Sequence, residues 1–515
     1  MIELIIGLAP FLPALVGFTI PLVYLLTKSR SLILFLTTFT MLILIILTSI
    51  IMHNAYTSGN PLVFKAGGWP PPIGITYIVD KFTALMGFVT SIVLFAISLY
   101  SVGYIVDEGY PWYSALLLGN AAGLLGVIYT GDLFNLFVML EVAGVSAYAL
   151  VMYYRHRPIS VVAGLKYAFI ASLGTALYLL AMGLVYNFYG TLNLVDFSIK
   201  LTNHHEMIEI LAFGIILVLS LWAFSIKSGV FPNHFWLPDA HPAAPTPISA
   251  LLSGLVVNTG VIGLYKILYI GTGLVNNDPL GIIRSLVSLI TILMGGLSAI
   301  VGALLMNTQR DIKRLIAYST VMNLGFLFMG LGCLTHGGLR ATLYYMSMHS
   351  FAKATLFLSA GYFIKQANTR LIDDLSGTGM RSPLVGFIFI ISVLTLAGIP
   401  PLPGFLAKLM LYEALFELNI GLAIIMVIAS AIGLLAYMKL LYIVVFETPR
   451  KTIQPLTMKS AIISMLLLSM IIILMGAMFL FNPRLTEMVI DAAARESTID
   501  IVSYIEQVKI ILKPL

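Results

Sequence analysis

Charged residues and cysteine are scarce in this sequence. Only 10% of its 515 residues are charged, and one residue is a cysteine, Cys333. Soluble domains carry roughly 25% charged residues, so the composition argues against a soluble enzyme held by an anchor. One cysteine excludes an intramolecular disulfide and any multi-cysteine metal or iron–sulfur site. We therefore expect no cofactor in this chain, and any redox cofactor must sit on another polypeptide.

Apolar residues are abundant instead, at 60% of the chain, with a mean hydropathy of +1.02. A helix needs ~20 apolar residues to cross a bilayer, and on that rule we predict an all-α polytopic membrane protein of about fourteen spans. One membrane domain should cover 1–481, with 482–515 lying along its surface as an amphipathic helix. The predicted spans are 3–27, 31–53, 78–105, 112–130, 133–154, 161–189, 207–231, 244–270, 281–306, 312–333, 338–366, 383–413, 419–446 and 458–481.

Basic residues predict the orientation of these spans, because Lys and Arg are concentrated in cytoplasmic loops. They cluster after odd-numbered spans, at Lys28, Arg30, Arg155, Arg157, Arg310, Lys313, Arg314, Lys365, Arg370, Arg381, Arg450 and Lys451. The loops after even-numbered spans hold few, such as Lys65, Lys200 and Arg340. Both termini are therefore predicted on the outer side of a cell membrane. These loops also explain the net charge of +6 without an acidic partner.

Two spans are predicted to be broken. One contains KSGVFPNHFWLPDAHPAAPTP from Lys227 onward, and the other contains AGIPPLPGFLAK, which ends at Lys408. Proline and glycine at this density interrupt a helix. A broken helix at membrane depth is tolerated only where it faces protein or water. Paired breaks indicate two inverted units of five helices, about 112–270 and 281–446, with spans seven and twelve broken.

Five ionisable side chains fall inside predicted spans: Glu141, Lys227, His349, Lys353 and Lys408. A charge at the centre of a bilayer costs on the order of 3 kcal/mol, so five of them call for an explanation. The simplest use of buried acids and bases in a membrane is to hold and pass protons. The alternatives are lysines that reach the interface, a static ion pair and a hydrogen-bonded core histidine.

Spacing suggests how these side chains are arranged. Glu141 needs a cationic partner, because an unpaired buried carboxylate would take up a proton; Lys227 is the first candidate and Lys166 the second. His349 and Lys353 are four residues apart, which puts them on one face of a helix. Lys227 and Lys408 lie beside the two breaks, where free carbonyl groups and water can solvate an ammonium.

Further polar residues are candidates for the relay or its surroundings. His234, Asp239 and His241 together suggest a metal site, but the segment lacks an HExxH-like helix or a cysteine, so a loop-ordering role without metal is predicted. No phosphate-binding glycine loop, nucleophile elbow or dinucleotide fingerprint occurs in the sequence. The full set of these candidates is Lys166, His234, Asp239, His241, Ser253, Asn258 and Glu413.

Four segments carry a family resemblance: GDLFNLFVMLEVAGVSAYALV, KSGVFPNHFWLPDAHPAAPTPISALLSG, DIKRLIAYSTVMNLGF and AGIPPLPGFLAK. They resemble the proton-translocating antiporter-like family. That family includes the D subunit of Mrp sodium/proton antiporters and the three large pumping subunits of complex I. It also includes the H subunit of archaeal membrane-bound hydrogenase and sulfane reductase complexes, to which the chain looks closest in type. The resemblance covers nearly the whole chain.

The resemblance implies a fold, a mechanism and partners. The fold would have fourteen transmembrane helices with inverted five-helix repeats. Protons would pass from Glu141 and Lys227 through the centre, at His349 and Lys353, to Lys408. The implied partners are small Mrp-type membrane subunits, with a hydrogenase or related redox module and sodium exchange as further options. The chain itself would perform no redox chemistry.

One departure from the family pattern concerns the centre of the relay. In SGLVVNTGVIGLYKIL many relatives have a lysine where this chain has Asn258, and the histidine that others have near Ser253 is also missing. The bridge between the two units would then be water, Asn258 or His349.

Three other functions compete with proton translocation. A stand-alone transporter for a small solute would need a roomy midplane pocket, and it would run alone when purified. Another alternative is a structural subunit that has lost transport, and Asn258 is the only residue in the sequence that suggests it. A quinone-processing enzyme subunit lacks both a recognisable quinone site and an electron donor in this chain.

Overall fold

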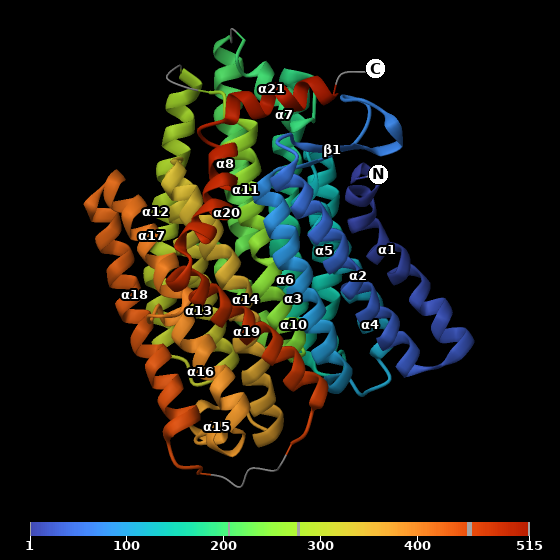
Figure 1. Cartoon of the computed structure of the whole chain (residues 1–515), viewed down its shortest axis with the longest axis vertical. Coiled ribbons are helices and arrows are strands. Elements are labelled where there is room, and N and C mark those ends of the chain that lie inside the picture. Colours follow the sequence, from blue (N-terminus) through green and yellow to red (C-terminus); the bar gives the residue numbers. More distant parts are fainter. Residues whose placement is uncertain (1, 204–205, 276–278, 451–455, 513–515) are drawn as a thin grey trace.

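The computed structural model describes residues 2–203, 206–275, 279–450 and 456–512, apart from the side chain of Leu485. Nearly all of them lie in helices that run roughly along one axis of the molecule (Figure 1). Lys451, one of the basic residues used to predict the orientation, lies outside the described residues.

Eleven helices lie within residues 2–203 and 206–275. Their bounds are α1 Ile2–Thr27, α2 Arg30–Thr57, α3 Lys81–Tyr104, α4 Tyr110–Tyr129, α5 Leu133–Val151, α6 Pro158–Tyr189, α7 Leu194–Lys200, α8 Met207–Ser228, α9 Leu237–Ala243, α10 Thr246–Leu251 and α11 Asn258–Tyr265. The later helices are α12 Pro279–Asn307, α13 Ile312–Gly332, α14 His336–Ala367, α15 Thr378–Arg381, α16 Pro383–Ala397, α17 Pro403–Leu418, α18 Ile420–Leu441, α19 Lys459–Phe481, α20 Pro483–Glu496 and α21 Ile501–Leu512.

The chain is a polytopic membrane protein. Among the described residues, 12 helical segments are long and apolar enough to cross a membrane, or 13 if one bent pair counts as a span. Twelve of the fourteen predicted spans match one of these 12 segments, and the predicted spans at 338–366 and 383–413 do not. The first coincides with α14, which carries several polar side chains and is buried among its neighbours. The second is divided between α16 and α17, of 15 and 16 residues, so neither piece alone reaches the length of a span.

A short hairpin interrupts the helical pattern between α2 and α3. Strand β1, Leu62–Lys65, pairs antiparallel with β2, Thr76–Val79. Their sequences, LVFK and TYIV, are rich in the β-branched and aromatic residues that favour strands. The predicted span at 78–105 therefore begins later in the structure, at Lys81, where Asp80 caps α3 by accepting a hydrogen bond from the Thr83 amide at 2.7 Å.

Both predicted breaks are present. Helix α8 ends at Gly229 (φ 63°), and the chain continues through a 3-10 turn at Asn233–Trp236 into α9. Helix α16 ends at Gly398 (φ 82°), and α17 starts at Pro403. A positive φ is a left-handed conformation that favours glycine, so each break begins at a residue that can end a helix without strain.

The two prospective halves share local features. Helices α5 and α13 both begin after an aspartate that caps them, Asp132 and Asp311. The helices that follow, α6 and α14, each have 32 residues. The five-helix units and their inverted layout stay predictions.

Two π-helical turns flank α11, at Leu252–Val256 and Lys266–Gly271. The whole segment from Thr246 to Gly271 is buried within the bundle. A π turn carries one more residue per turn than an α-helix and is often found at functional sites.

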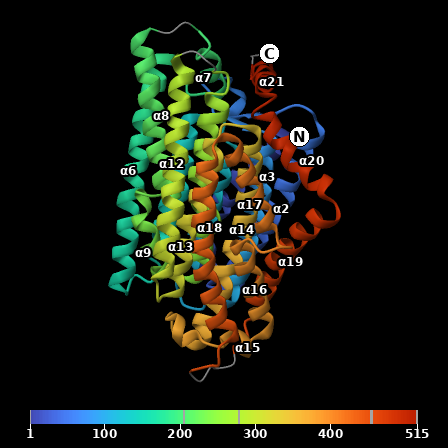
Figure 2. The same cartoon turned by 90° about the vertical axis from the view of Figure 1, so that its left-hand side faces the viewer.

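The C-terminal segment forms two helices rather than one. Helix α20 runs along the side of the bundle against α14, α19 and α3, and α21 crosses the end near β1 and α7 (Figure 2). His336 Nε2 lies 2.7 Å from Asp491 Oδ1, and the Tyr56 hydroxyl donates to the Val489 carbonyl at 3.0 Å. The first turns of α1 and the last turns of α21 lie toward this same end of the bundle (Figure 1).

Candidate functional site

Glu141 of α5 and Lys227 of α8 form the ion pair that the sequence suggested. The Lys227 Nζ lies 3.7 Å from Glu141 Oε1 and donates to the Tyr148 hydroxyl at 3.3 Å. The lysine side chain is 7% exposed and the glutamate 29%. A separation of 3.7 Å is long for a charge-assisted hydrogen bond, so the pair is loosely held.

Lys166 is not a partner of Glu141. Its Nζ lies 2.7 Å from Asp239 Oδ2, and Arg314 reaches Asp239 Oδ1 at 2.6 Å. All three side chains are at least 31% exposed. This pair of bridges ties α6 and α13 to α9, the short helix after the first break, so the loop-ordering role predicted for Asp239 has a structural basis.

The two histidines of the same segment, His234 and His241, contact aromatic rings and not Asp239. His234 packs against Phe231 and Phe235, and His241 stacks on Phe357 at 4.7 Å. Both ring nitrogens of His241 are buried and without a hydrogen-bond partner. No group of three His, Cys, Asp or Glu side chains that could hold a metal is found in the described parts of the chain.

Asn258 connects the first unit to α14. Its Nδ2 donates to the Gly254 carbonyl and to the Ser350 hydroxyl, each at 2.9 Å, while its Oδ1 is buried without a partner. The free Oδ1 leaves one acceptor on this amide. Ser253 instead bonds to Thr320 of α13 at 2.7 Å and lies apart from this contact.

His349 and Lys353 are both fully buried in α14. Lys353 donates to the Ser319 hydroxyl and, at 3.3 Å, to the Ile316 carbonyl of α13. Neither ring nitrogen of His349 has a hydrogen-bond partner. An imidazole can accept or donate a proton, and the relay role of His349 stays a prediction.

Lys408 of α17 lies across the second break. It donates to the Ala397 carbonyl at 2.8 Å and to the Ser430 hydroxyl of α18 at 2.7 Å. Both acceptors are neutral, so neither hydrogen bond pairs the lysine with a negative charge. Glu413, five residues further along α17, is exposed and lines a cavity under α20 rather than a site near Lys408.

Two further lysines are buried in the structure, although the sequence does not suggest them as site candidates. Lys313, which the sequence places among loop charges, is buried and donates to the Ala244 carbonyl at 2.8 Å and the Ser249 hydroxyl at 3.1 Å. Lys266 donates to the Thr130 carbonyl at 2.7 Å. The position of Lys266 inside a predicted span is a usable signal, whereas Lys313 stands directly beside loop residues.

A buried polar group also lies between α13, α14 and α18. Asn323 accepts a hydrogen bond from the Tyr345 hydroxyl and donates to the Tyr437 hydroxyl at 3.3 Å. Tyr437 shares α18 with Ser430, the partner of Lys408. Asparagine and tyrosine are too common in helices for sequence alone to mark these three.

The helices that carry the site residues pack in order. Helix α8 packs on α11, the π turn at Leu252–Val256 packs on α14, and α14 packs on α17. The site residues carried by these helices are amines, an imidazole, an amide and hydroxyls, which can each exchange a proton or a hydrogen bond with a neighbour or a water molecule. The arrangement can therefore hold protons at several buried points.

Comparison with known proteins identifies the family of the chain. The family model described as NADH:quinone oxidoreductase/Mrp antiporter, transmembrane, matches residues 130–433, more than half of the chain. The chain is 32% identical to the D subunit of the Na⁺/H⁺ antiporter of Alkalihalophilus pseudofirmus over 445 residues, covering 84% of this chain and 86% of that protein. It is 29% identical to the N subunit of the NADH-quinone oxidoreductase of Desulforudis audaxviator over 390 residues, 75% of each chain.

Solved structures share the fold over nearly the full length. A chain of the membrane-bound sulfane sulfur reductase, an archaeal respiratory membrane complex, superimposes with a TM-score of 0.88 at 28% identity, covering 98% of this chain and 99% of that one. A chain of the Mrp complex from Dietzia superimposes with a TM-score of 0.85 at 24% identity and the same coverage. This chain belongs to the NADH:quinone oxidoreductase/Mrp antiporter transmembrane family.

Proposed function

We propose that this chain translocates protons across a cell membrane as one subunit of a larger complex. The protons would pass along Glu141, Lys227, His349, Lys353 and Lys408. The observation that carries the proposal is the loose ion pair between Glu141 and Lys227, at 3.7 Å, beside the first broken helix. Opening and closing of such a pair would couple movement of the carboxylate to release and uptake of a proton by the lysine.

Opening this pair would control the first proton. While Glu141 stays near, its charge favours the ammonium form of Lys227. When the carboxylate moves away, the desolvated lysine releases its proton to a neighbour or to water. The Tyr148 hydroxyl, already a hydrogen-bond acceptor of Lys227, can hold the lysine in place during that movement.

The centre of the path would run through neutral groups. Asn258 bonds to Ser350, one residue from His349, so the amide, the hydroxyl and water provide the bridge that a lysine provides in relatives. Lys353, three residues after Ser350 on α14, follows with its Ser319 partner on α13. Lys408 would end the path, because Ala397 and Ser430 solvate its amine in either protonation state.

The proposal that the chain works within a complex is based on its relatives. Their names describe part of an antiporter, part of a quinone oxidoreductase and a respiratory membrane complex. We infer that this chain assembles with other Mrp-like membrane subunits, and that a hydrogenase or sulfane reductase module can drive it. Exchange against sodium, through this subunit or a neighbour, is part of the same proposal, as is a plasma-membrane location with both termini outside. The chain is expected to carry no cofactor.

The experiment is proton flux into vesicles that contain the purified complex. Lys227→Ala and Glu141→Ala are each expected to abolish proton movement while the complex still assembles. Lys439→Ala is the matched control, because this lysine is exposed near the end of α18. Normal pumping by both site variants would refute the assignment, and native mass spectrometry of the complex would identify the attached subunits.

A further inference from the structure

Helix α20 covers two neighbouring cavities that the proton path does not use. One has a volume of about 390 Å³ and the other about 220 Å³. They share three lining residues, Tyr344 of α14 and Thr486 and Ile490 of α20. The two cavities thus lie next to each other beneath the same helix, on the outside of the bundle.

The larger cavity is apolar. Apart from Tyr344, Ser347 and Thr486, all of its lining side chains are hydrocarbon, aromatic or thioether groups, among them Phe88 and Met475. Its volume is in the range of ligand pockets, ~300–1,000 Å³. Leu474 and Met478 of α19 line it and are also exposed on the surface, so the cavity borders the membrane. A hydrocarbon chain fits this environment.

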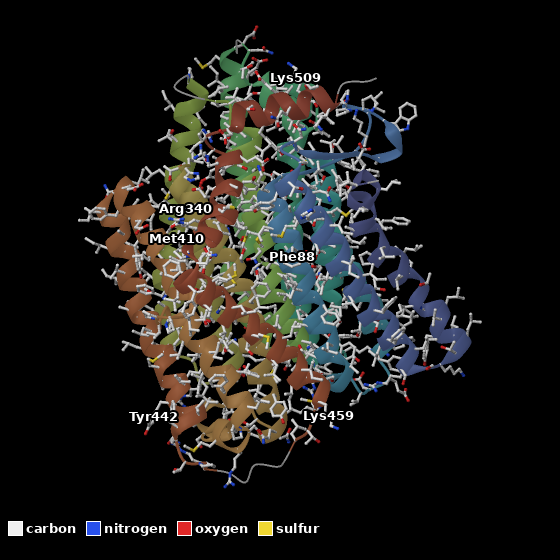
Figure 3. All side chains as sticks on the ribbon, in the orientation of Figure 1. Phe88, Arg340, Met410, Tyr442, Lys459 and Lys509 are labelled. Carbon is white, nitrogen blue, oxygen red and sulfur yellow. The ribbon has the colours of Figure 1, made fainter. Side chains whose placement is uncertain are left out.

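The smaller cavity is charged. Arg340 of α14, Glu413 of α17 and Glu487 of α20 line it. Arg340 and Met410, from this cavity, and Phe88, from the apolar one, are labelled in Figure 3. The sequence places Arg340 among loop residues, but it lies in the second turn of α14.

Polar atoms in the charged cavity lack partners. Arg340 Nε, the Tyr344 hydroxyl and Thr486 Oγ1 are all buried and make no hydrogen bond with the described residues. No ion pair joins Arg340 to either glutamate within the described part of the chain. The three unsatisfied donors can bind a negatively charged group, and the two carboxylates beside them can bind a positive one. The cavity therefore suits a ligand that carries both charges.

We propose that the two cavities bind one phospholipid with an amine-bearing headgroup. The phosphate accepts hydrogen bonds from Arg340, Tyr344 and Thr486, because a guanidinium fork matches phosphate oxygens. The ammonium lies between Glu413 and Glu487. One hydrocarbon chain enters the apolar cavity, and the second lies on the exposed side of α19. The lipid would fasten α20 to α14, α17 and α19.

The apolar cavity beside the charged one favours a lipid over a soluble anion. A soluble phosphate would satisfy the donors but would leave the apolar cavity empty. A quinone would fill the apolar cavity but would bring no charge to Arg340 or the glutamates.

The test uses the purified full chain in detergent, or the whole complex, with native mass spectrometry. We expect one retained phosphatidylethanolamine after delipidation and re-addition, and weaker retention of phosphatidylglycerol. Arg340→Gln should lower lipid retention about tenfold, as the loss of a charge-assisted contact predicts. Arg381→Gln is the matched control, because it removes the same charge from an exposed position in α15.

A second variant tests the headgroup assignment. Replacing both glutamates, Glu413→Gln with Glu487→Gln, should reverse the preference, so that phosphatidylglycerol is retained at least as well as phosphatidylethanolamine. Retention of inorganic phosphate or phosphoethanolamine alone, with no lipid, would overturn the proposal. So would equal lipid retention in Arg340→Gln and Arg381→Gln, or extraction of an isoprenoid quinone instead of a phospholipid.

Discussion

The ammonium of Lys408 donates a hydrogen bond to the carbonyl oxygen of Ala397, 2.8 Å away, across the break between α16 and α17. The next residue, Gly398, has a φ of 82°. A Cβ atom added there would lie 2.8 Å from Cδ of Lys408. The lysine therefore occupies the space that a side chain at position 398 would need.

Gly398→Ala should displace Lys408 and strain the backbone. We expect a loss of stability of about 1–3 kcal/mol from the left-handed conformation, and a drop in proton flux of about tenfold or more, equivalent to the loss of one well-placed contact. Thermal unfolding and vesicle flux measure the two effects. Gly183→Ala is the control, because a Cβ at Gly183 in α6 meets no atom within 4 Å. Equal flux in the two variants would contradict the link between the break and Lys408.

Asp239→Asn should affect stability and leave transport intact. The carboxylate bridges Lys166 and Arg314 in a partly exposed position, where an ion pair contributes about 0–1 kcal/mol. Salt should weaken the difference between variant and parent, since such pairs are screened. Thermal unfolding at low and high salt, beside vesicle flux, tests this. A complete loss of flux would instead place Asp239 in the relay.

Asn258→Leu should interrupt the centre of the path. The change removes the hydrogen bond from Asn258 to Ser350, whose hydroxyl keeps its own bond to the Met346 carbonyl, so the cost is that of one hydrogen bond, about 0.5–1.5 kcal/mol. Proton flux should fall while the complex still assembles. Thr259→Val next to it is a fair control, since the Thr259 hydroxyl donates to the Val256 carbonyl of its own helix, at 2.6 Å. Unchanged flux in Asn258→Leu would exclude Asn258 as the bridge between the two units and leave water or His349.

Attachment of the C-terminal helices should depend on pH through Glu496, which lies outside the membrane-spanning segments. Burial raises the pKa of the Glu496 carboxyl from 4.5 to about 7, and the Asp80 carboxylate adds to the rise, while the amide and ammonium of Lys81 oppose it. The folded state thus binds the proton more tightly than the unfolded one. Its stabilising effect is full below about pH 4.5 and is lost as pH rises through about 7.

Hydrogen exchange of α20 and α21 amides measures this dependence. Exchange should speed up between about pH 5 and pH 8 beyond the intrinsic effect of pH on exchange. Glu496→Gln should flatten the dependence, because an amide oxygen can still accept from the Lys81 backbone at the position of the 2.7 Å bond. The same slope in variant and parent would exclude Glu496 as the cause.

Hydrophobic length and proline-glycine density are enough to predict the helical membrane fold and both breaks. These are local properties: a run of apolar residues must cross the bilayer, and Gly229 and Gly398 end helices wherever the chain goes next. The Glu141–Lys227 contact is also predictable, because a buried charge needs an opposite charge and few cationic residues lie inside the predicted spans. The hairpin at Leu62–Lys65 is not foreseen, since its strands are too short to stand out.

Contacts between distant helices cannot be predicted in this way. Lys166 is also a candidate for Glu141 by charge, and only the packing of α6 on α9 directs it to Asp239. Lys313 resembles a loop residue because its burial depends on neighbours around α9 and α10 that sequence spacing does not reveal. The choice of Ser319 and Ser430 as lysine partners likewise follows from packing.

The π-helical turn at Leu252–Val256 holds one residue more than an ordinary α-helical turn. Deleting one residue there would let it tighten into an α-helical turn that covers nearly the same rotation, so Asn258 would still face Ser350. Deleting a residue within the regular part of α11 would instead rotate everything after it by about 100° around the helix axis. The wide turn can thus absorb a change of chain length that the regular helix beside it cannot.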